Sequence, residues 1–132
     1  MTMNDPIADF LTRIRNASAA KHAACEVSTS KMKEQLARIF ADQGYISEWS
    51  VVGDGTKRTL TVKLKYGPDG AAVIRGIERV SKPGRRDYKS ASDVHRVLNG
   101  LGTAVVSTSQ GLLTDAEARR RNVGGEVVCN IW

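Results

Sequence analysis

The stretch that decides the fold covers residues 100–126 and reads GLGTAVVSTSQGLLTDAEARRRNVGGE. Residues 103–106 are mostly β-branched or apolar, which favours a strand, and the polar run at 107–110 favours a loop. Thr114 is the expected N-cap of a helix, with Glu117 at N3 reaching back to the cap amide in a capping box. We therefore predict a strand, a polar loop and a short basic helix.

The polar run is the first functional candidate, because a protein core has no need of four adjacent polar side chains. It consists of Ser107, Thr108, Ser109 and Gln110 and is followed by Gly111. The arginines at 119–121, in contrast, fall in the last turn of the predicted helix, where cations suit the negative end of the helix dipole. We expect the run to contact a ligand and these arginines to be peripheral or purely structural.

The rest of the chain predicts an α+β fold with an N-terminal α-β-α-β-β domain at 1–66 and a mostly β C-terminal domain with short helices at 67–132. The boundary is placed at the turn-forming sequence GPDG of residues 67–70. In the first domain we predict a helix starting after Asp5, a second helix whose N-cap comes from the run Ser28-Thr29-Ser30, a strand at 23–27, and a hairpin of strands 45–52 and 57–66. In the second we predict strands at 73–80, 85–89 and 126–131 and a short helix at 94–98.

Composition places the chain in the ordinary globular range, with 132 residues, 41% hydrophobic and 26% charged. No apolar run approaches the roughly 20 residues that span a bilayer, and the N-terminus lacks the pattern of a secretory signal. We therefore expect a cytoplasmic protein. Cys25 and Cys129 have no Cys or His neighbours at zinc-site spacing, so they are expected to be buried strand thiols, and no metal is expected.

Charge points to a polyanion partner. The net charge is +6, and residues 79–89 hold five cations, Arg79, Lys82, Arg85, Arg86 and Lys89, against the single acid Asp87. Aromatic residues are only 5%, which disfavours binding of single strands by stacking. Hydroxyls, amides and arginines on a β scaffold suit the phosphates, 2′-hydroxyls and shallow minor groove of folded RNA. Tyr88 could be a core residue or could stack on a base or sugar.

Alternatives remain open at three places. Arg13 and Arg15 could be solvated helix surface or a minor phosphate-contacting face. Lys31 and Lys33 stand at the positive end of the second predicted helix, which is a mild pointer to an anion. An enzyme is disfavoured, because GxxxxGK(S/T) and GxGxxG motifs are absent and Ser107 stands where a nucleophile elbow needs glycine. A hydrolase using Ser109 and His95 would need the two side chains within hydrogen-bond reach.

Four stretches resemble a known family. They are DPIADFLTRIRN from Asp5, VSKPGRRDY from Val80, NGLGTAVVSTSQGLLTDAEAR from Asn99 and VGGEVVC from Val123. Together they span essentially the whole chain, which on these residues resembles the bacterial small-subunit ribosomal protein S8 family. The resemblance implies a two-domain α+β protein without enzymatic activity or cofactor. It also implies direct binding to a helix in the central domain of small-subunit rRNA, a role in subunit assembly, and neighbouring ribosomal proteins as partners.

The resemblance further implies that in some bacteria the protein represses a ribosomal-protein operon by binding a similar hairpin in the mRNA. It assigns the principal RNA contact to Ser107, Thr108 and Ser109. Tyr88 and Glu126 match positions on the same face, to which we add the adjoining Gln110, Gly111 and Gly125, and Arg86 of the basic stretch. A secondary face in the first domain matches Asp5, Thr12, Arg13, Arg15, Ser30 and Lys31.

Three positions depart from the family pattern. Gln110 replaces the usual lysine, so a phosphate contact there becomes a neutral hydrogen bond. Asp87 replaces an apolar residue and places an acid beside Tyr88. Thr103 replaces an aliphatic residue. We expect these changes to shift local affinity and leave the family resemblance intact.

Overall fold

The computed structural model describes residues 5–132 and confirms an α+β fold. Residues Asp9–Arg75 form one compact unit, and Gly76–Trp132 form another together with the described residues up to Ala8. The domain boundary predicted between residues 66 and 67 stays a prediction. A turn with a hydrogen bond from Gly70 N to Gly67 O occupies the stretch where we placed it.

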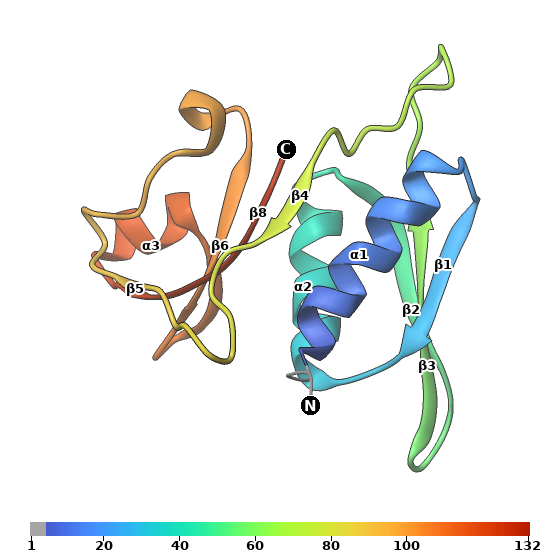
Figure 1. Cartoon of the computed structure of the whole chain (residues 1–132), viewed down its shortest axis with the longest axis horizontal. Helices are drawn as coiled ribbons and strands as arrows, with labels where there is room; N and C mark the ends of the chain where they lie inside the picture. Colours follow the sequence, from blue (N-terminus) through green and yellow to red (C-terminus); the bar gives the residue numbers. More distant parts are fainter. Residues whose placement is uncertain (1–4) are drawn as a thin grey trace. The chain divides into compact units, whose positions relative to one another are not determined.

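The unit Asp9–Arg75 has the predicted α-β-α-β-β order (Figure 1). Its elements are α1 (Pro6–Ala19), which starts just outside the unit, then β1 (Ala24–Ser28), α2 (Lys31–Asp42), β2 (Ile46–Asp54) and β3 (Lys57–Leu64). The strands form an antiparallel sheet in the order β1-β3-β2, so the central strand is the last one in sequence. Asp54 pairs with Lys57, which leaves Gly55 and Thr56 as the two-residue turn of the predicted β2–β3 hairpin.

Both predicted caps of this unit's helices are confirmed. Asp5 Oδ1 accepts a hydrogen bond from Ala8 N at 3.1 Å at the start of α1. Ser30 Oγ accepts one from Lys33 N at 3.3 Å at the start of α2. Figure 1 shows the two helices lying along the sheet, and their apolar stripes are buried with one face of the central strand, through Phe10, Leu11, Ile14, Leu36, Ile39, Phe40, Leu60, Val62 and Leu64.

The other unit is built on the last strand of the chain. Its strands are β4 (Ile77–Arg79), β5 (Tyr88–Lys89), β6 (Thr103–Thr108), β7 (Gly111–Thr114) and β8 (Gly125–Ile131), with the helix α3 (Asp115–Arg121) after β7. All pair antiparallel in the order β4-β8-β6-β7, and β5 pairs with the start of β8. β8 therefore touches three strands that are distant in sequence, and its Val127, Val128, Cys129 and Ile131 are buried.

The predicted polar loop is wrong in extent. Ser107 and Thr108 belong to β6, and residues 111–114, for which no strand is predicted from the sequence, form β7. Thr108 pairs with Gly111, so only Ser109 and Gln110 remain as a two-residue hairpin turn. The short apolar pair Leu112–Leu113 gave too little pattern to predict a strand, and it is the pairing with β6 that makes it one.

The capping box at α3 is confirmed in one of its two bonds. Thr114 Oγ1 accepts a hydrogen bond from Glu117 N at 3.2 Å, as predicted. The Glu117 carboxylate, however, accepts from the Thr114 hydroxyl at 3.3 Å and not from the Thr114 amide. Thr114 is also a strand residue paired with Val105, so its backbone is engaged in the sheet ladder.

Three elements predicted between residues 73 and 98 differ from the structure. The strand at 73–80 is confined to β4, because Val73 N donates to Lys65 O while Ile77 pairs with Ile131. The basic strand at 85–89 is reduced to β5, since Lys82 and Arg85 bond to each other and close a turn.

The helix predicted at 94–98 is absent from this described stretch. Val94 is buried against Ala104, Val106 and Val127, which holds the segment on the sheet in a non-helical form. A 3₁₀ turn follows at Val97–Gly100, in which Leu98 and Asn99 adopt left-handed backbone angles. A short helix depends on tertiary packing, and here the packing favours a non-helical segment.

Both cysteines are free and buried in strands, as predicted. Burial raises the pKa of the Cys129 thiol to about 12 and also raises that of the Cys25 thiol. No helix within residues 5–132 has the length and apolar character needed to cross a membrane.

Gly125 permits the close approach of β8 and β6. A Cβ built on Gly125 would lie 2.0 Å from the Ser107 carbonyl oxygen. We expect Gly125→Ala to lower the free energy of unfolding by about 1–3 kcal/mol, measured by urea denaturation, because the strands must separate to admit a methyl group. Gly67→Ala is the control, since the nearest backbone atom to its Cβ would be Ala71 O at an ordinary 3.8 Å and the nearest atom of all a side-chain oxygen of Asp69 at 3.0 Å. Equal stability of the two variants would contradict this explanation.

Candidate nucleic-acid interface

The tip of the β6–β7 hairpin is shaped by Thr108. Its hydroxyl donates to Gly111 O at 2.8 Å and accepts from Gln110 N at 3.0 Å, so it closes the turn from inside. Gly111 follows with a φ of +98°, a backbone angle that glycine adopts without strain. Of the predicted site residues, Thr108 and Gly111 therefore have a clear role in the shape of the tip.

Ser107 and Ser109 differ from Thr108 in having no such internal role. Within residues 5–132 no hydrogen bond is formed by either serine hydroxyl, and neither side chain is buried. A hydroxyl is one donor and a double acceptor, so each serine offers its full capacity to a partner. These are the two polar side chains of the run that the fold leaves available.

Tyr88, Glu126 and Ser107 lie in one row across three strands. Glu126 of β8 is paired with Tyr88 of β5 on one side and with Ser107 of β6 on the other. Residues directly opposite each other in paired strands project to the same face of a sheet. Tyr88 is 69% exposed, so the alternative of a core residue is wrong. The structure thus places an exposed aromatic ring, a carboxylate and a free hydroxyl side by side.

Glu126 holds the basic loop, residues 80–87, against the start of β8. Its Oε2 accepts hydrogen bonds from the Ser81 hydroxyl at 2.5 Å and from Arg86 Nη1 at 2.8 Å. Ser81 is completely buried and its Oγ also accepts from Asp87 N at 3.0 Å. Partial burial opposes ionisation of Glu126, but these two hydrogen bonds and the charges of Arg86 and Arg79 outweigh it and hold the pKa of the carboxyl below its usual range.

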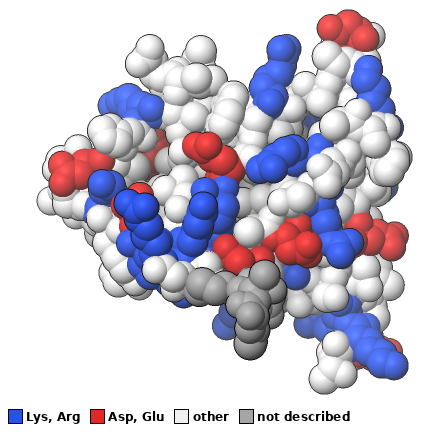
Figure 2. Space-filling model, in the orientation of Figure 1, with Lys and Arg blue, Asp and Glu red and all other residues white. Residues whose placement is uncertain are grey.

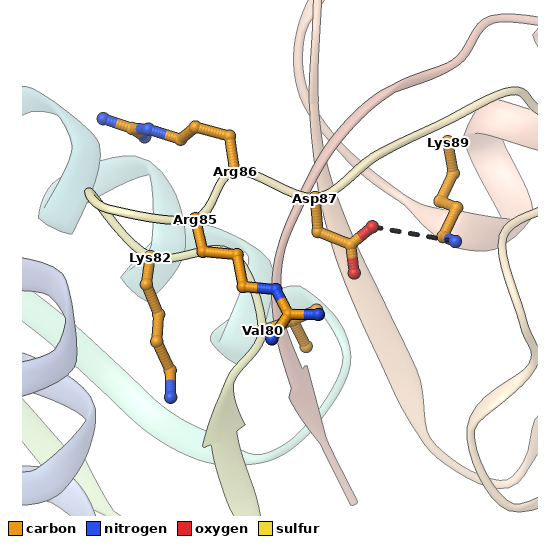
Figure 3. A pocket seen from close by; sticks show the side chains of 6 residues that line it. All are labelled: Val80, Lys82, Arg85, Arg86, Asp87 and Lys89. Carbon is orange, nitrogen blue, oxygen red and sulfur yellow. Dashed lines mark ion pairs between the residues drawn. The ribbon is translucent and has the colours of Figure 1, made fainter.

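The cations of the basic loop and the neighbouring Lys89 line a hollow. It is lined by Val80, Lys82, Arg85, Arg86, Asp87 and Lys89. Figure 3 shows Arg86 turned away from Arg85, while Lys89 lies 3.7 Å from the Asp87 carboxylate. Asp87, one of the departures from the family pattern, therefore partly offsets the charge of Lys89. Lys82 and Arg85 form no ion pair in the described part of the chain.

Charge alone does not mark the interface. In Figure 2 the basic side chains on the visible face are interspersed with acidic ones. Residues 103–114 of the β6–β7 hairpin carry no charged side chain at all. The distinctive feature of the site is therefore the combination of free hydroxyls, an exposed ring and nearby arginines.

Apart from Asp5, the residues predicted for the secondary face lie at two places in the unit Asp9–Arg75. Thr12, Arg13 and Arg15 lie exposed on α1, and Arg13 forms an exposed ion pair with Asp9 at 3.0 Å. Ser30 and Lys31 line a separate depression of this unit, together with Arg58.

Two residues of the set considered for this face have structural explanations. Lys33, which we had taken as a pointer to an anion, is buried and its Nζ donates to Ser28 O at 2.8 Å. Asp5 caps α1 and pairs with Arg79 at 3.2 Å, which accounts for both of its carboxylate oxygens.

The sequence does not reveal two residues that hold predicted site residues in place, Ser81 and Arg121. Ser81 could not be found from its neighbours, because a serine before a turn is common and only its burial reveals the link to Glu126. Arg121 was set aside on the dipole argument, yet its Nη1 donates to Gln110 Oε1 at 3.1 Å. No group of three or more His, Cys, Asp or Glu that could hold a metal is found among residues 5–132.

The lowered pKa of Glu126 predicts a pH-dependent stability. A carboxyl whose pKa falls on folding stabilises the protein above its unfolded pKa, near 4.5, and loses this contribution as the pH falls through the lowered value. We expect wild type to be more stable than Glu126→Gln at pH 7, with the difference narrowing below pH 4.5, as measured by urea denaturation at several pH values. Glu48→Gln, which removes an exposed partner of Lys63, is the control. A gap that is constant from pH 7 to pH 3 would refute the assignment.

Comparison with known proteins identifies the family of the chain. The model of the family described as Ribosomal protein S8 matches residues 5–132. The small ribosomal subunit protein uS8 of Rubrobacter xylanophilus is 54% identical over 132 residues, which is 100% of both chains. The proteins of the same name from Lactobacillus delbrueckii subsp. bulgaricus and Clostridioides difficile are 53% and 52% identical over the same full length. The chain therefore belongs to the ribosomal protein S8 family.

Proposed function

We propose that this protein is a structural constituent of the small ribosomal subunit that binds folded rRNA directly through the row Tyr88–Glu126–Ser107 and the adjoining hairpin tip. The observation that carries the proposal is the pair of uncommitted hydroxyls of Ser107 and Ser109 beside an exposed tyrosine ring. The relatives named uS8, which match over their full length, support a place in the small ribosomal subunit.

The chemistry of the row suits an RNA helix better than DNA or a single strand. Serine hydroxyls can both donate to and accept from a ribose 2′-hydroxyl, which the wide minor groove of A-form RNA displays. One exposed ring can stack on a single base or sugar but is too little for a stacking platform. Arg86, held by Glu126 at 2.8 Å, stands at the edge of the row as a fixed cation for a phosphate.

The remaining members of the set have supporting roles in the proposal. Thr108, Gly111 and Gly125 shape the hairpin and its distance from β8, and Gln110 lies in the turn. Thr12, Arg13, Arg15, Ser30 and Lys31 form a secondary RNA-contacting face on the other unit, and Asp5 fixes the start of α1 and the position of Arg79.

The finer parts of the proposal concern the target. We propose that the target is a helix in the central domain of the small-subunit rRNA. The protein binds it early in subunit assembly, together with neighbouring ribosomal proteins. Residues 67–132 form the RNA-binding domain. We propose no catalytic activity, since within residues 5–132 the Ser109 hydroxyl forms no hydrogen bond to His95 or to any other base that could activate it. Ribosome-bound protein in the cytoplasm is the corresponding location.

Binding of the purified protein to a central-domain rRNA helix tests the proposal. We expect Ser109→Ala to reduce the preference for this helix over an unrelated RNA duplex, because it removes a hydroxyl that reads the groove. Arg85→Ala removes a charge without breaking the Glu126 network, and we expect it to weaken both RNAs alike and to reduce the slope of log K against log salt by about 0.7–0.9. Fluorescence anisotropy at several salt concentrations measures both effects.

Matched controls separate the outcomes. Ser50→Ala removes an exposed serine from the sheet of the other unit and should leave both affinities unchanged. Equal affinity of the wild type for the rRNA helix and the unrelated duplex would refute specific recognition. If Arg85→Ala lost the preference for the rRNA helix over the unrelated duplex and Ser109→Ala kept it, the roles assigned to the two residues would be reversed.

Repression of an operon mRNA stays a prediction of the family resemblance, because the same surface would serve both RNAs. A hairpin from the leader of the operon that encodes the protein, titrated beside the rRNA helix, tests it directly. Binding of that hairpin within about tenfold of the rRNA helix would support autoregulation, and binding no tighter than to the unrelated duplex would contradict it.

A further inference from the structure

The last turn of α3 delivers one arginine to the tip of the β6–β7 hairpin. Arg121 Nη1 donates to the side-chain oxygen of Gln110 at 3.1 Å, and its Nη2 lies 3.6 Å from the Glu117 carboxylate. Gln110 is one of the two residues of the hairpin turn, next to Ser109. The guanidinium is therefore held by one hydrogen bond and one ion pair, at the turn that also contains Ser109.

The three consecutive arginines of α3 are not equivalent. Arg119 is only 22% exposed and bonds to Asp115 and to Val94 O, so it serves the fold. Arg120 forms no hydrogen bond or ion pair within residues 5–132. Arg121 is 46% exposed and is the one that reaches the hairpin turn.

Arg121 supplies a positive charge that the β6–β7 hairpin does not contain. Residues 103–114 contain no cation, so the hydroxyls of Ser107 and Ser109 have no charge of their own element to attract a phosphate. A guanidinium has five N–H donors, and the hydrogen bond to Gln110 and the ion pair with Glu117 leave donors for a further partner. The planar group also suits bidentate binding of a phosphate, and its two anchors reduce the conformational entropy that binding would cost.

We propose that Arg121 is a phosphate-binding residue of the RNA interface and that Gln110 is the residue that positions it at the hairpin tip. This inference rests on the RNA-binding function proposed above. It also gives Gln110 a role of its own, since the neutral amide accepts from a cation on α3 and so brings positive charge to the tip. The helix dipole alone explains neither contact, because it favours all three arginines of the turn equally.

Arg121→Ala and Arg120→Ala form a matched pair for the test. Both remove one charge from the same helical turn, but only Arg121 lies at the hairpin tip. With the central-domain rRNA helix as probe, we expect Arg121→Ala to weaken binding about tenfold and to reduce the salt slope by about one, and Arg120→Ala to change affinity less than about twofold. Thermal unfolding of each variant checks that the fold is retained.

Gln110→Ala tests the positioning role without changing the charge. We expect it to weaken binding by several fold in the wild type and to have no further effect in Arg121→Ala, because the amide acts through the guanidinium. Arg121→Lys should recover only part of the affinity, since an ammonium cannot keep the same planar contact with both anchors.

The outcomes distinguish this inference from the function on which it rests. If the wild type binds the rRNA helix but Arg121→Ala and Arg120→Ala weaken it equally, the assignment of Arg121 is wrong and the proposed function stands. If Gln110→Ala and Arg121→Ala have independent, additive effects, Gln110 does not position the arginine. If the wild type does not bind the rRNA helix in preference to an unrelated duplex, both proposals fall.

Discussion

The pairing of β8 with β6 is the constraint on which the interface depends. β8 holds β4 and β5 along one edge and β6 along the other, so residues from three separate parts of the chain meet across it. The contact is close because Gly125 has no side chain where the Ser107 carbonyl approaches. A one-residue slip in this pairing would turn Ser107 to the opposite face from Tyr88 and Glu126. The arrangement of the proposed site is therefore a consequence of strand register.

Two carboxylates on either side of this pairing hold the neighbouring segments in place. Buried Asp115 accepts from Ala104 N at 3.2 Å, a ladder position that β7 no longer reaches, and it also binds Arg119. Glu126 binds buried Ser81 and exposed Arg86, so it fixes the basic loop against the strand. Asp115 and Glu126 each accept hydrogen bonds from a buried group, Ala104 N and the Ser81 hydroxyl. Each carboxylate also orients an arginine, Arg119 or Arg86, so the same contact satisfies a buried group and fixes a cation.

The fold also separates the polar residues of the hairpin into two kinds. Thr108 is committed to the turn and Gln110 to Arg121, whereas Ser107 and Ser109 keep their hydroxyls free. This division could not be seen from composition, since the four residues look alike in the sequence. It narrows the proposed direct contacts to two serines and an exposed tyrosine, with the arginines Arg86 and Arg121 at their borders.

The sequence by itself determined the local features of this protein: the helix caps at Asp5, at Thr114 and within residues 28–30, the β2–β3 hairpin, the buried stripes and most of the strands β6 and β8; its motifs also indicated the family. These depend on neighbouring residues, and so local patterns predict them. Only the tertiary structure decided the extent of β4, β5 and β7, the non-helical form of residues 94–96 and the exposure of Tyr88. β7 depends on its hairpin partner β6, and the others depend on partners distant in sequence, such as β8 for Tyr88 or Val127 for Val94. A backbone or side chain that finds such a partner can override its local preference, because the net energy of pairing and burial exceeds the small differences in propensity.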